Sequence, residues 1–297
     1  MNISLKANQK WLGKNRQFKF NFLSIGLYIL TLLLCVTMLS PLFWVITTAL
    51  KGNNDIYKVP PEFFPKEFHW ENFPKSWEAI NFGRLFVNTF IITMLNVVGQ
   101  VASSMLVGYA LARIRFPGRK IWFYLFIGSM MLPSIVTLIP MFRLYLNLNW
   151  YDSWLPLWVP AFFGNPFYIF LARQYYLSIP YDLDESAKLD GANHFAIFTR
   201  IMIPLTTPVW LTMGILTFQS TWNDYLNPLI YLRSEETWTL ALGVATFKSS
   251  FAGVSNTQWN LYMAANLLYM LPPIIVFFVA QRYFMAGLGS LATRSQK

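Results

Sequence analysis

The chain has 297 residues, of which 55% are hydrophobic and only 12% are charged, whereas an ordinary soluble domain carries about 25% charged residues. The apolar residues lie in blocks long enough to cross a bilayer, which takes about 20 residues of helix. The net charge of +10 does not indicate nucleic-acid binding, because the basic residues flank the apolar blocks. The single cysteine, Cys35, excludes an intrachain disulfide and a cysteine-based metal or redox site, and we interpret it as an apolar packing residue.

Six apolar blocks predict an all-α polytopic membrane protein with six transmembrane helices. To within several residues, the predicted spans are 23–49, 85–111, 121–145, 154–173, 207–231 and 259–283. The first is too long for the apolar region of a signal peptide and lacks a small-residue cleavage pattern, so we expect a retained anchor. The predicted organisation is therefore a basic N-terminal tail (1–22), a membrane domain (23–283) and a C-terminal tail (284–297).

The orientation follows from the lysines and arginines of the connections. Basic residues without acids lie before span one, between spans two and three and after span six: Lys6, Lys10, Lys14, Arg16, Lys19, Arg113, Arg115, Arg119, Lys120, Arg282, Arg294 and Lys297. Segment 50–84 instead mixes both signs of charge. This pattern predicts that both termini are cytoplasmic.

Two longer connections are predicted on the outer side. Segment 50–84 contains four prolines together with Trp70 and Trp77, which argues against a long helix and favours a short, ordered cap at the outer interface. Segment 232–258 is polar, and neither connection resembles a separate domain. We find no internal repeat, which counts against secondary transporters built from duplicated halves.

The cytoplasmic loop 174–206 has the pattern of two short helices joined by a glycine turn. Acidic residues from Asp182 to Glu185 suit a helix start, and Asp190-Gly191 interrupts that helix. An amphipathic piece follows, with apolar residues at helical spacing up to the prolines that precede span five: Phe195, Phe198, Ile201 and Met202, before Pro204 and Pro208. A pair of short helices of this kind either docks in a groove of a partner or lies on lipid headgroups.

The residues of this loop resemble the EAA loop, which is the signature of ABC importer permeases. The pattern appears as Glu185-Ser186-Ala187, Asp190-Gly191-Ala192 and Ile203-Pro204-Leu205, with Ser186 replacing an alanine. The resemblance implies an ABC importer type I permease-like bundle. It also implies that a coupling helix docks in a cleft of an ATP-hydrolysing subunit through Glu185, Ser186, Ala187, Asp190, Gly191 and Ala192.

Further motifs are similar to the carbohydrate branch of that family, in particular to its six-span maltose-type subunit. They are Gly108-Tyr-Ala-Leu-Ala-Arg113, Phe116-Pro-Gly-Arg119 and Trp222-Asn-Asp-Tyr-Leu-Asn-Pro228. This resemblance, over most of 85–290, implies that the chain encloses half of a translocation pathway and works with a second, related but different permease. It also implies two ATPase subunits that bind ATP and Mg, and an extracytoplasmic protein that delivers a sugar. Glycerol-phosphate importers share the branch, so the solute stays open.

Asp224 is the only acid within the predicted spans, and a charge inside a membrane marks a pathway unless it is paired. On a helical wheel, the polar residues of span five share one arc: Thr217, Gln219, Ser220, Thr221, Asn223, Asp224 and Asn227. Phe218, Trp222, Tyr225 and Leu226 lie opposite, where Trp222 suits packing. We predict substrate-pathway positions at Gln219, Ser220, Asn223, Asp224 and Asn227, with Asn96 from span two. The alternative is that these groups tie span five to neighbouring helices or to the paired permease.

Other polar and proline positions allow similar alternatives. Asn96, Gln100 and Ser103 form a line along span two, and Pro133 and Pro140 are expected to kink or unwind span three. His194 is expected to contact the partner. We find no phosphate-binding loop, nucleophile elbow or metal-binding helix, so we expect no catalytic residue, metal or cofactor in this chain. A membrane enzyme would need clustered acids or histidines at one interface, and a proton-coupled transporter would need more titratable groups than Asp224.

Overall fold

The computed structural model of the protein describes residues 22–250 and 258–294, and within these ranges every regular element is helical. The elements in chain order are α1 (Phe22–Ala49), α2 (Asn53–Ile56), α3 (Asn72–Ala79), α4 (Phe82–Arg113), α5 (Arg119–Ser129), α6 (Ser134–Asn147), α7 (Leu155–Trp158), the 3₁₀-helix η1 (Val159–Phe163), α8 (Pro166–Ser178), α9 (Asp182–Leu189), α10 (His194–Ile197), the π-helical turn η2 (Phe198–Met202), α11 (Ile203–Leu205), α12 (Thr207–Trp222), α13 (Leu226–Tyr231), α14 (Leu240–Ser250) and α15 (Trp259–Arg294). The predicted tail up to residue 21, residues 295–297 and the stretch 251–257 lie outside the described residues.

Four described helical stretches are long and apolar enough to cross a membrane: Ile25–Ala49, Phe82–Arg113, Leu155–Ser178 and Trp259–Gln281. Two further stretches are pairs of helices with a bend between them. The bends are 101° between Arg119–Ser129 and Ser134–Asn147, and 78° between His194–Leu205 and Thr207–Trp222. Counting each pair as one crossing gives the six predicted spans. Helices are required here because the bilayer offers no partner for unpaired backbone groups.

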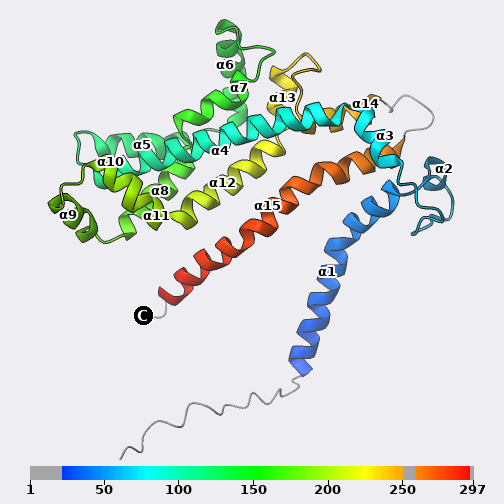
Figure 1. Cartoon of the computed structure of the whole chain (residues 1–297), viewed down its shortest axis with the longest axis horizontal. Helices are drawn as coiled ribbons and strands as arrows, with labels where there is room; N and C mark the ends of the chain where they lie inside the picture. Colours follow the sequence, from blue (N-terminus) through cyan, green and yellow to red (C-terminus); the bar gives the residue numbers. More distant parts are fainter. Residues whose placement is uncertain (1–21, 251–257, 295–297) are drawn as a thin grey trace, which may run out of the picture.

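Helix α4 is the spine of the fold (Figure 1). Its 32 residues extend over about 48 Å at 1.5 Å per residue, with α8 and α12 packed along it. The short helices α2, α3 and α14 lie at one end of α4, and α5, α9 and α10 lie at the other (Figure 1). Close packing needs Gly108, because a Cβ there would lie 2.6 Å from that of Ala172 on α8. Helix α4 therefore connects these two groups of short helices.

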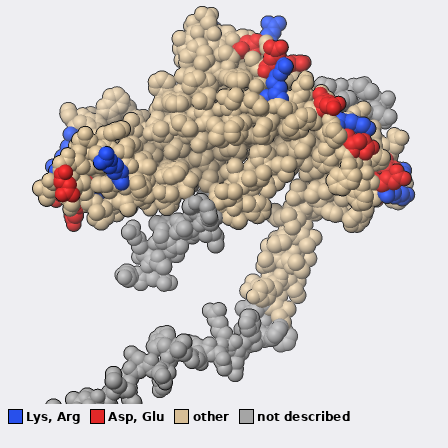
Figure 2. Space-filling view, viewed as in Figure 1, with Lys and Arg blue, Asp and Glu red and all other residues tan. Residues whose placement is uncertain are grey.

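On the face in Figure 2, lysine, arginine, aspartate and glutamate side chains gather at the left end, at the right end and around the protrusion at the top. The broad body between them shows none. Two buried clusters fill the interior along α4. One contains Tyr109, Tyr176 and Met202, and the other contains Phe82 and Trp222. A charge-free middle suits a layer of lipid tails, in which an unpaired charge is costly.

The interpretation of Trp222 as a packing residue is consistent with its surroundings. Its side chain is 0% exposed, and its ring stacks on Phe218 with centroids 5.4 Å apart. The indole Nε1–H donates to the Tyr269 carbonyl over 3.2 Å. The ring thus joins α12 to α15.

Span three differs from the single helix expected over 121–145. The chain breaks after Met130, and Pro133 precedes the first residue of α6. Pro133 cannot donate a backbone hydrogen bond to the preceding turn, and the two halves then diverge by 101°. Pro140, in contrast, lies inside α6. The expected disruption of the helix is therefore confirmed at Pro133, whereas the helix continues without a break through Pro140.

Span five also differs, because the helix expected over 207–231 ends at Trp222. Pro228 lacks the N–H that would continue the helical bond to the carbonyl of Asp224. The Asp224 side chain instead accepts the backbone N–H of Asn227 over 3.2 Å, which competes with helical bonding. The helical wheel, which assumed one continuous helix, is therefore wrong beyond Asn223, because Asp224 lies in the turn after α12 and Asn227 lies in the short helix α13.

Span four, expected over 154–173, consists of three helical pieces. Gly164 has a positive φ of +84°, and the Asn165 side chain accepts the N–H of Phe167 as the cap of α8. Because glycine adopts positive φ without strain, it separates η1 from α8, which continues to Ser178. At the end of the chain, α15 extends past the predicted limit at 283 to Arg294.

Segment 50–84 contains no long helix, as its prolines predict. It is held to both neighbouring spans through Asn72, which is buried. The Asn72 amide donates to the carbonyls of Ala49 (2.8 Å) and Lys51 (3.0 Å), and its oxygen accepts the amide of Asn260 on α15 over 3.0 Å. The segment is therefore an ordered part of the fold.

Helix α1 meets the body only near its C-terminal end, next to α15, and otherwise diverges from it (Figure 1). None of its apolar window is buried by the rest of the chain, and Thr47 to Leu50 are the first buried residues along it. Cys35 is exposed. Its interpretation as a packing residue is therefore wrong within this chain, because α1 contacts no other helix at that level.

Candidate functional site

The loop after α8 folds as two short helices with a turn between them, as its pattern predicts. Asp182, Asp184 and Glu185 occupy the first turn of α9, where carboxylates stabilise the positive end of the helix dipole. Gly191 follows with a φ of +84°. The N–H of Ala192 donates to the carbonyl of Ala187 over 2.9 Å, which closes the helix in the manner of a Schellman turn. We call residues 180–206 the coupling loop.

A buried ion pair fixes the coupling loop to the spine. Nη1 of Arg113, the last residue of α4, lies 3.3 Å from Oδ2 of Asp184, and both side chains are 3% exposed. The other terminal nitrogen of Arg113 donates to the carbonyls of Tyr176 (2.7 Å) and Ile179 (2.8 Å) at the end of α8. The Tyr181 hydroxyl returns a hydrogen bond to the Arg113 carbonyl over 3.2 Å. Three helices are thus joined at one guanidinium.

Burial raises the pKa of Asp184, whereas the Arg113 guanidinium acts in the opposite direction. Sequence reasoning did not single out this pair. A signal was present, because Arg113 ends one of the quoted motifs and Asp184 lies beside Glu185.

The coupling loop is buried where it meets the helix bundle and exposed on the side away from the bundle, which we call its outer side. Ala187, Ile197 and Met202 are buried against the first core cluster. Among the predicted coupling residues, Glu185, Ser186, Asp190 and Gly191 are exposed, and Ala192 is half-buried. Apolar side chains are also exposed on this loop, among them Leu183, Leu189 (90%), Phe195 (70%) and Leu205. Apolar groups that a water-soluble surface would not present in such number favour contact with another protein.

His194 lies on the same outer side. It is exposed, and its Nδ1 lies 3.5 Å from the Tyr109 hydroxyl. This position is compatible with the expected surface contact.

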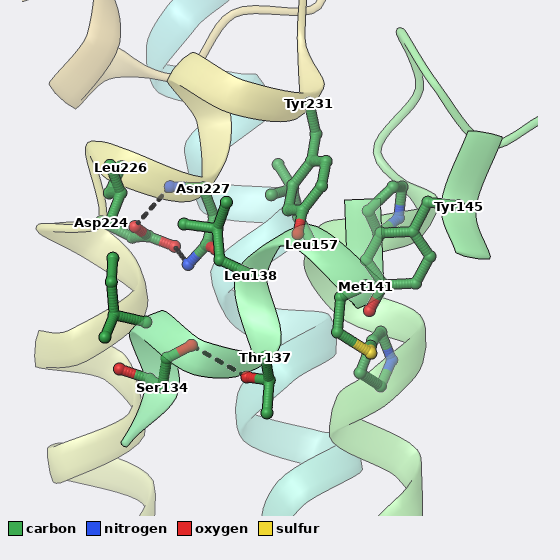
Figure 3. A pocket seen from close by; sticks show the side chains of 13 residues that line it. Ser134, Thr137, Leu138, Met141, Tyr145, Leu157, Asp224, Leu226, Asn227 and Tyr231 are labelled. Carbon is green, nitrogen blue, oxygen red and sulfur yellow. Dashed lines mark hydrogen bonds between the residues drawn. The ribbon is translucent and has the colours of Figure 1, made fainter. Parts of the chain in front are cut away.

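A second candidate site is a cavity of about 320 Å³ that is bounded by α6, α7, η1 and the turn after α12. Figure 3 shows the Asp224 and Asn227 side chains facing each other at one wall, with the rings of Tyr145 and Tyr231 at the other. The amide of Asn227 donates to Oδ2 of Asp224 over 2.8 Å, and its backbone N–H donates to Oδ1. Further lining residues include Ser134, Thr137, Leu138, Met141, Leu157 and Leu226.

The structure brings together only two of the predicted pathway residues. Asp224 and Asn227 line the cavity, whereas Gln219, Ser220 and Asn223 lie on the exposed side of α12 and at its end and are not among the lining residues. The Asn223 amide oxygen accepts the Tyr269 hydroxyl over 2.7 Å, which ties it to α15.

Asn96 and its line on α4 join this helix to its neighbours. The buried Asn96 amide donates to the carbonyls of Ile92 and Leu157, each over 2.9 Å. Ser103 donates to the carbonyl of Ala161 over 3.1 Å, and Gln100 accepts the hydroxyl of Thr217 over 3.4 Å. These bonds have the geometry of packing ties, which was the alternative considered for such groups.

Four polar lining residues escaped sequence reasoning: Ser134, Thr137, Tyr145 and Tyr231. Ser134, Thr137 and Tyr145 lie on α6 and approach Asp224 because the chain bends at Pro133, whereas Tyr231 lies on α13, after the break in span five. Pro133 signals the first break, and it does not specify the direction of the bend.

The rim of the cavity is held by Asp152, which has a positive φ of +58°. Its N–H donates to the Tyr231 carbonyl over 2.9 Å. Its Oδ1 accepts the N–H groups of Arg233 and Ser234, each over 2.8 Å. These bonds and the Ser234 hydroxyl lower the pKa of Asp152 to about 2. The connection before α7 is thereby fixed to the connection after α13.

Comparison with known proteins identifies the family of the chain. Residues 104–289 match the family described as binding-protein-dependent transport system inner membrane component. The chain belongs to this family. It is also 32% identical over 287 residues to the probable ABC transporter permease protein YurM of Bacillus subtilis, a match that covers 96% of this chain and 90% of that protein. The resemblance to ABC importer permeases is therefore confirmed.

Two further relatives of this permease differ in the solutes that their names state. It is 32% identical to the arabinooligosaccharides transport system permease protein AraQ of Bacillus subtilis, over 91% of this chain and 95% of that protein. It is 31% identical to the sn-glycerol-3-phosphate transport system permease protein UgpE of Yersinia enterocolitica, over 90% and 96%. A crystal structure of a bacterial ABC transporter that imports the acidic polysaccharide alginate has a chain of the same fold, with a TM-score of 0.80 and 24% identity over 89% of this chain and 96% of that one.

Proposed function

We propose that this permease is one subunit of an ATP-driven, binding-protein-dependent importer of a sugar or oligosaccharide. In this proposal it forms half of the translocation pathway and is coupled to ATPase subunits through α9. The observation that carries the proposal is the coupling loop, whose root is fixed to α4 and α8 by Arg113 and Asp184 while Leu189 and Phe195 are left exposed. A surface that is both exposed and rigidly attached can transmit a displacement caused by a partner to the helices behind it.

The energy comes from partner subunits. Two ATPase subunits bind ATP and Mg, and their closure moves α9 through contacts with Glu185, Ser186 and the Asp190-Gly191 turn. Because Arg113 joins α9 to the ends of α4 and α8, the displacement reaches two spanning helices together. The bundle then changes from inward-facing to outward-facing. This chain itself hydrolyses no ATP and holds no cofactor or metal.

A second, related permease completes the pathway. Gln219, Ser220 and Asn223 are exposed near the outer part of α12, and polar groups in a membrane face protein or water rather than lipid. Most of helix α1 is not covered by the other described helices. This leaves a long apolar surface for the partner permease to cover. We infer a heterodimer with both termini in the cytoplasm of a bacterial cell, and a solute-binding protein that docks on the outer connections.

The chemistry of the cavity suits a sugar. The carboxylate of Asp224 and the amide of Asn227 hydrogen-bond to hydroxyl groups. Tyr145 and Tyr231 also line the cavity, but each is only 5% exposed and stacks on Trp150 or Phe142, so the case for a sugar rests on the polar pair. The arabinooligosaccharide relative favours this solute class. The alternative is a polar solute such as glycerol phosphate, which the UgpE relative favours; a secondary transporter without ATPase partners is the remaining rival.

The test is ATP-driven uptake by the purified four-subunit complex in proteoliposomes, with the solute-binding protein outside. A Leu189→Asp variant places a charge at the proposed docking surface, and Val59→Asp, at a side chain that is 92% exposed in the outer cap, is the matched control. We expect Leu189→Asp to lose co-purification with the ATPase subunits, or to reduce uptake at least tenfold, while Val59→Asp keeps co-purification with the ATPase subunits. Full uptake by the Leu189→Asp complex contradicts the proposal.

A further inference from the structure

We propose that the cavity at Asp224 excludes anionic solutes, so that the importer carries a neutral sugar and not a phosphorylated or acidic one. The inference rests on the proposed function, because it takes the cavity to be part of the pathway. It concerns charge selection, which the relatives do not decide: the names of the permeases and the alginate importer refer to both neutral and anionic solutes.

The fixed charge of the cavity has one sign. Asp224 is its only aspartate or glutamate, and no lysine, arginine or histidine is among the lining residues. The nearest basic residue along α6, Arg143, is exposed and is not one of them. A phosphate or carboxylate in this space therefore meets a carboxylate and no guanidinium, ammonium or imidazolium.

The hydrogen bonds of Asp224 leave it able to receive a sugar. Each of its two oxygens accepts one hydrogen bond from Asn227, whereas a carboxylate offers about four acceptor sites. The remaining acceptor sites of Asp224 can each take a hydrogen bond from a donor, and a sugar supplies hydroxyl donors around its ring. An ionised phosphate or carboxylate supplies only acceptors, so it cannot satisfy them.

Nothing else in the wall compensates for this mismatch. The Thr137 hydroxyl already donates to the Ser134 carbonyl over 2.8 Å. The other donors, on Ser134, Tyr145 and Tyr231, are neutral hydroxyls. Repulsion between the Asp224 carboxylate and an anionic solute is not offset by any cationic side chain among the lining residues. The part of the cavity that this chain supplies thus favours a neutral polyol over its anionic counterpart.

The experiment compares uptake of one neutral oligosaccharide with uptake of the same oligosaccharide carrying a terminal uronic acid. The purified complex in proteoliposomes transports each sugar separately, with a saturating amount of the same binding protein. The measured quantity is the ratio of the anionic to the neutral rate. Since the binding protein and the ATPase are the same in every preparation, their preferences cancel when this ratio is compared between variants.

We expect the unaltered complex to transport the neutral sugar at least tenfold faster than the acid. Asp224→Asn removes the charge and keeps the shape, so it should raise the anionic-to-neutral ratio about tenfold. Asp224→Glu, which keeps the charge, should leave the ratio low. Asn227→Lys places an ammonium beside the carboxylate at an exposed position and should raise the ratio even if Asp224→Asn does not assemble.

Two results overturn the inference alone: equal uptake of both sugars by the unaltered complex, or active Asp224→Asn and Asn227→Lys complexes that keep the original ratio. Both results leave sugar import, and with it the proposed function, intact. Uptake of neither sugar by the unaltered complex overturns the proposed function and this inference together.

Discussion

The coupling loop and the cavity lie on the same bundle but are held in different ways. The coupling loop is fixed at its root by a buried ion pair between side chains that are 3% exposed and by a packed apolar cluster. The cavity wall at Asp224 is held by one residue of its own turn, Asn227, and both residues have exposed surface. One region is held by buried contacts, and the other by contacts between partly exposed residues.

This difference fits the proposed function. In that proposal the coupling loop transmits motion from an ATPase and moves as one body with the helices behind it, which buried contacts allow. The proposed pathway wall opens and closes around a passing solute, so buried bonds on every side would hinder it. Each of the following changes tests one side of this contrast.

The largest effect is expected where the coupling loop joins α4. Asp184→Ala leaves the Arg113 guanidinium buried without its counter-charge, and removal of one partner of a buried pair costs about 3–5 kcal/mol. We expect a large drop in the thermal stability of the purified complex and loss of coupling between ATP hydrolysis and uptake. Thermal unfolding and a parallel uptake assay measure both.

The control is Asp182→Ala, which removes an exposed carboxylate from the same turn of α9. The double variant Arg113→Met with Asp184→Leu replaces the pair by apolar groups and should recover part of the lost stability, because neither charge is then left alone. If Asp184→Ala is as mild as Asp182→Ala, the ion pair does not fix the loop.

A smaller effect is expected at the turn of the coupling loop. Gly191 has a φ of +84°, and a Cβ built on it meets nothing within 4 Å. Within this chain, the cost of Gly191→Val is therefore backbone strain alone, about 1–2 kcal/mol for an L-residue in the left-handed region. We expect normal insertion into the membrane but reduced ATPase coupling, measured as solute transported per ATP hydrolysed.

Gly128→Val is the matched control, because Gly128 on α5 is equally open and has no positive φ. An equal loss of coupling in the two variants would indicate that side-chain bulk, and not the conformation of the turn, is responsible. That result would remove the turn from the rigid part of the coupling loop.

The contrast between the two regions also explains how much the sequence could predict. The first span was expected over 23–49 and α1 extends over Phe22–Ala49, because an unbroken apolar run has only one way to satisfy its backbone in lipid. The coupling loop was predictable for a similar reason: acidic residues, a glycine and spaced apolar residues are local signals for helix start, helix end and a buried face.

The cavity was not predictable, because it depends on breaks whose geometry is not local. Asn223-Asp224 followed by Pro228 signals the end of α12, and that signal was read as a continuous polar arc. Pro133 signals a break in span three, but the 101° bend that brings Ser134 and Tyr145 near Asp224 depends on packing against α7 and α13. Asn96 had the composition of a pathway residue and serves as a tie to Leu157.

The smallest effect is expected at the rim of the cavity, where pH is the sharper probe. The pKa of Asp152 is lowered to about 2, whereas an unfolded aspartate titrates near about 3.9. Its stabilising bonds are therefore fully present above about pH 4 and are lost as the pH falls toward 2. Water screens this half-buried group, so the loss stays below about 1 kcal/mol.

The measurement is hydrogen exchange at the backbone N–H groups of Arg233 and Ser234, which donate hydrogen bonds to Asp152. The exchange rates are corrected for the intrinsic rate at each pH. We expect protection to fall between about pH 4 and pH 2 in the unaltered protein. Asp152→Asn should show weaker protection that does not change over this range. Identical pH profiles for the two proteins would mean that the rim is held by packing, as the coupling loop is, and the contrast between the two regions would end at the wall of Asp224.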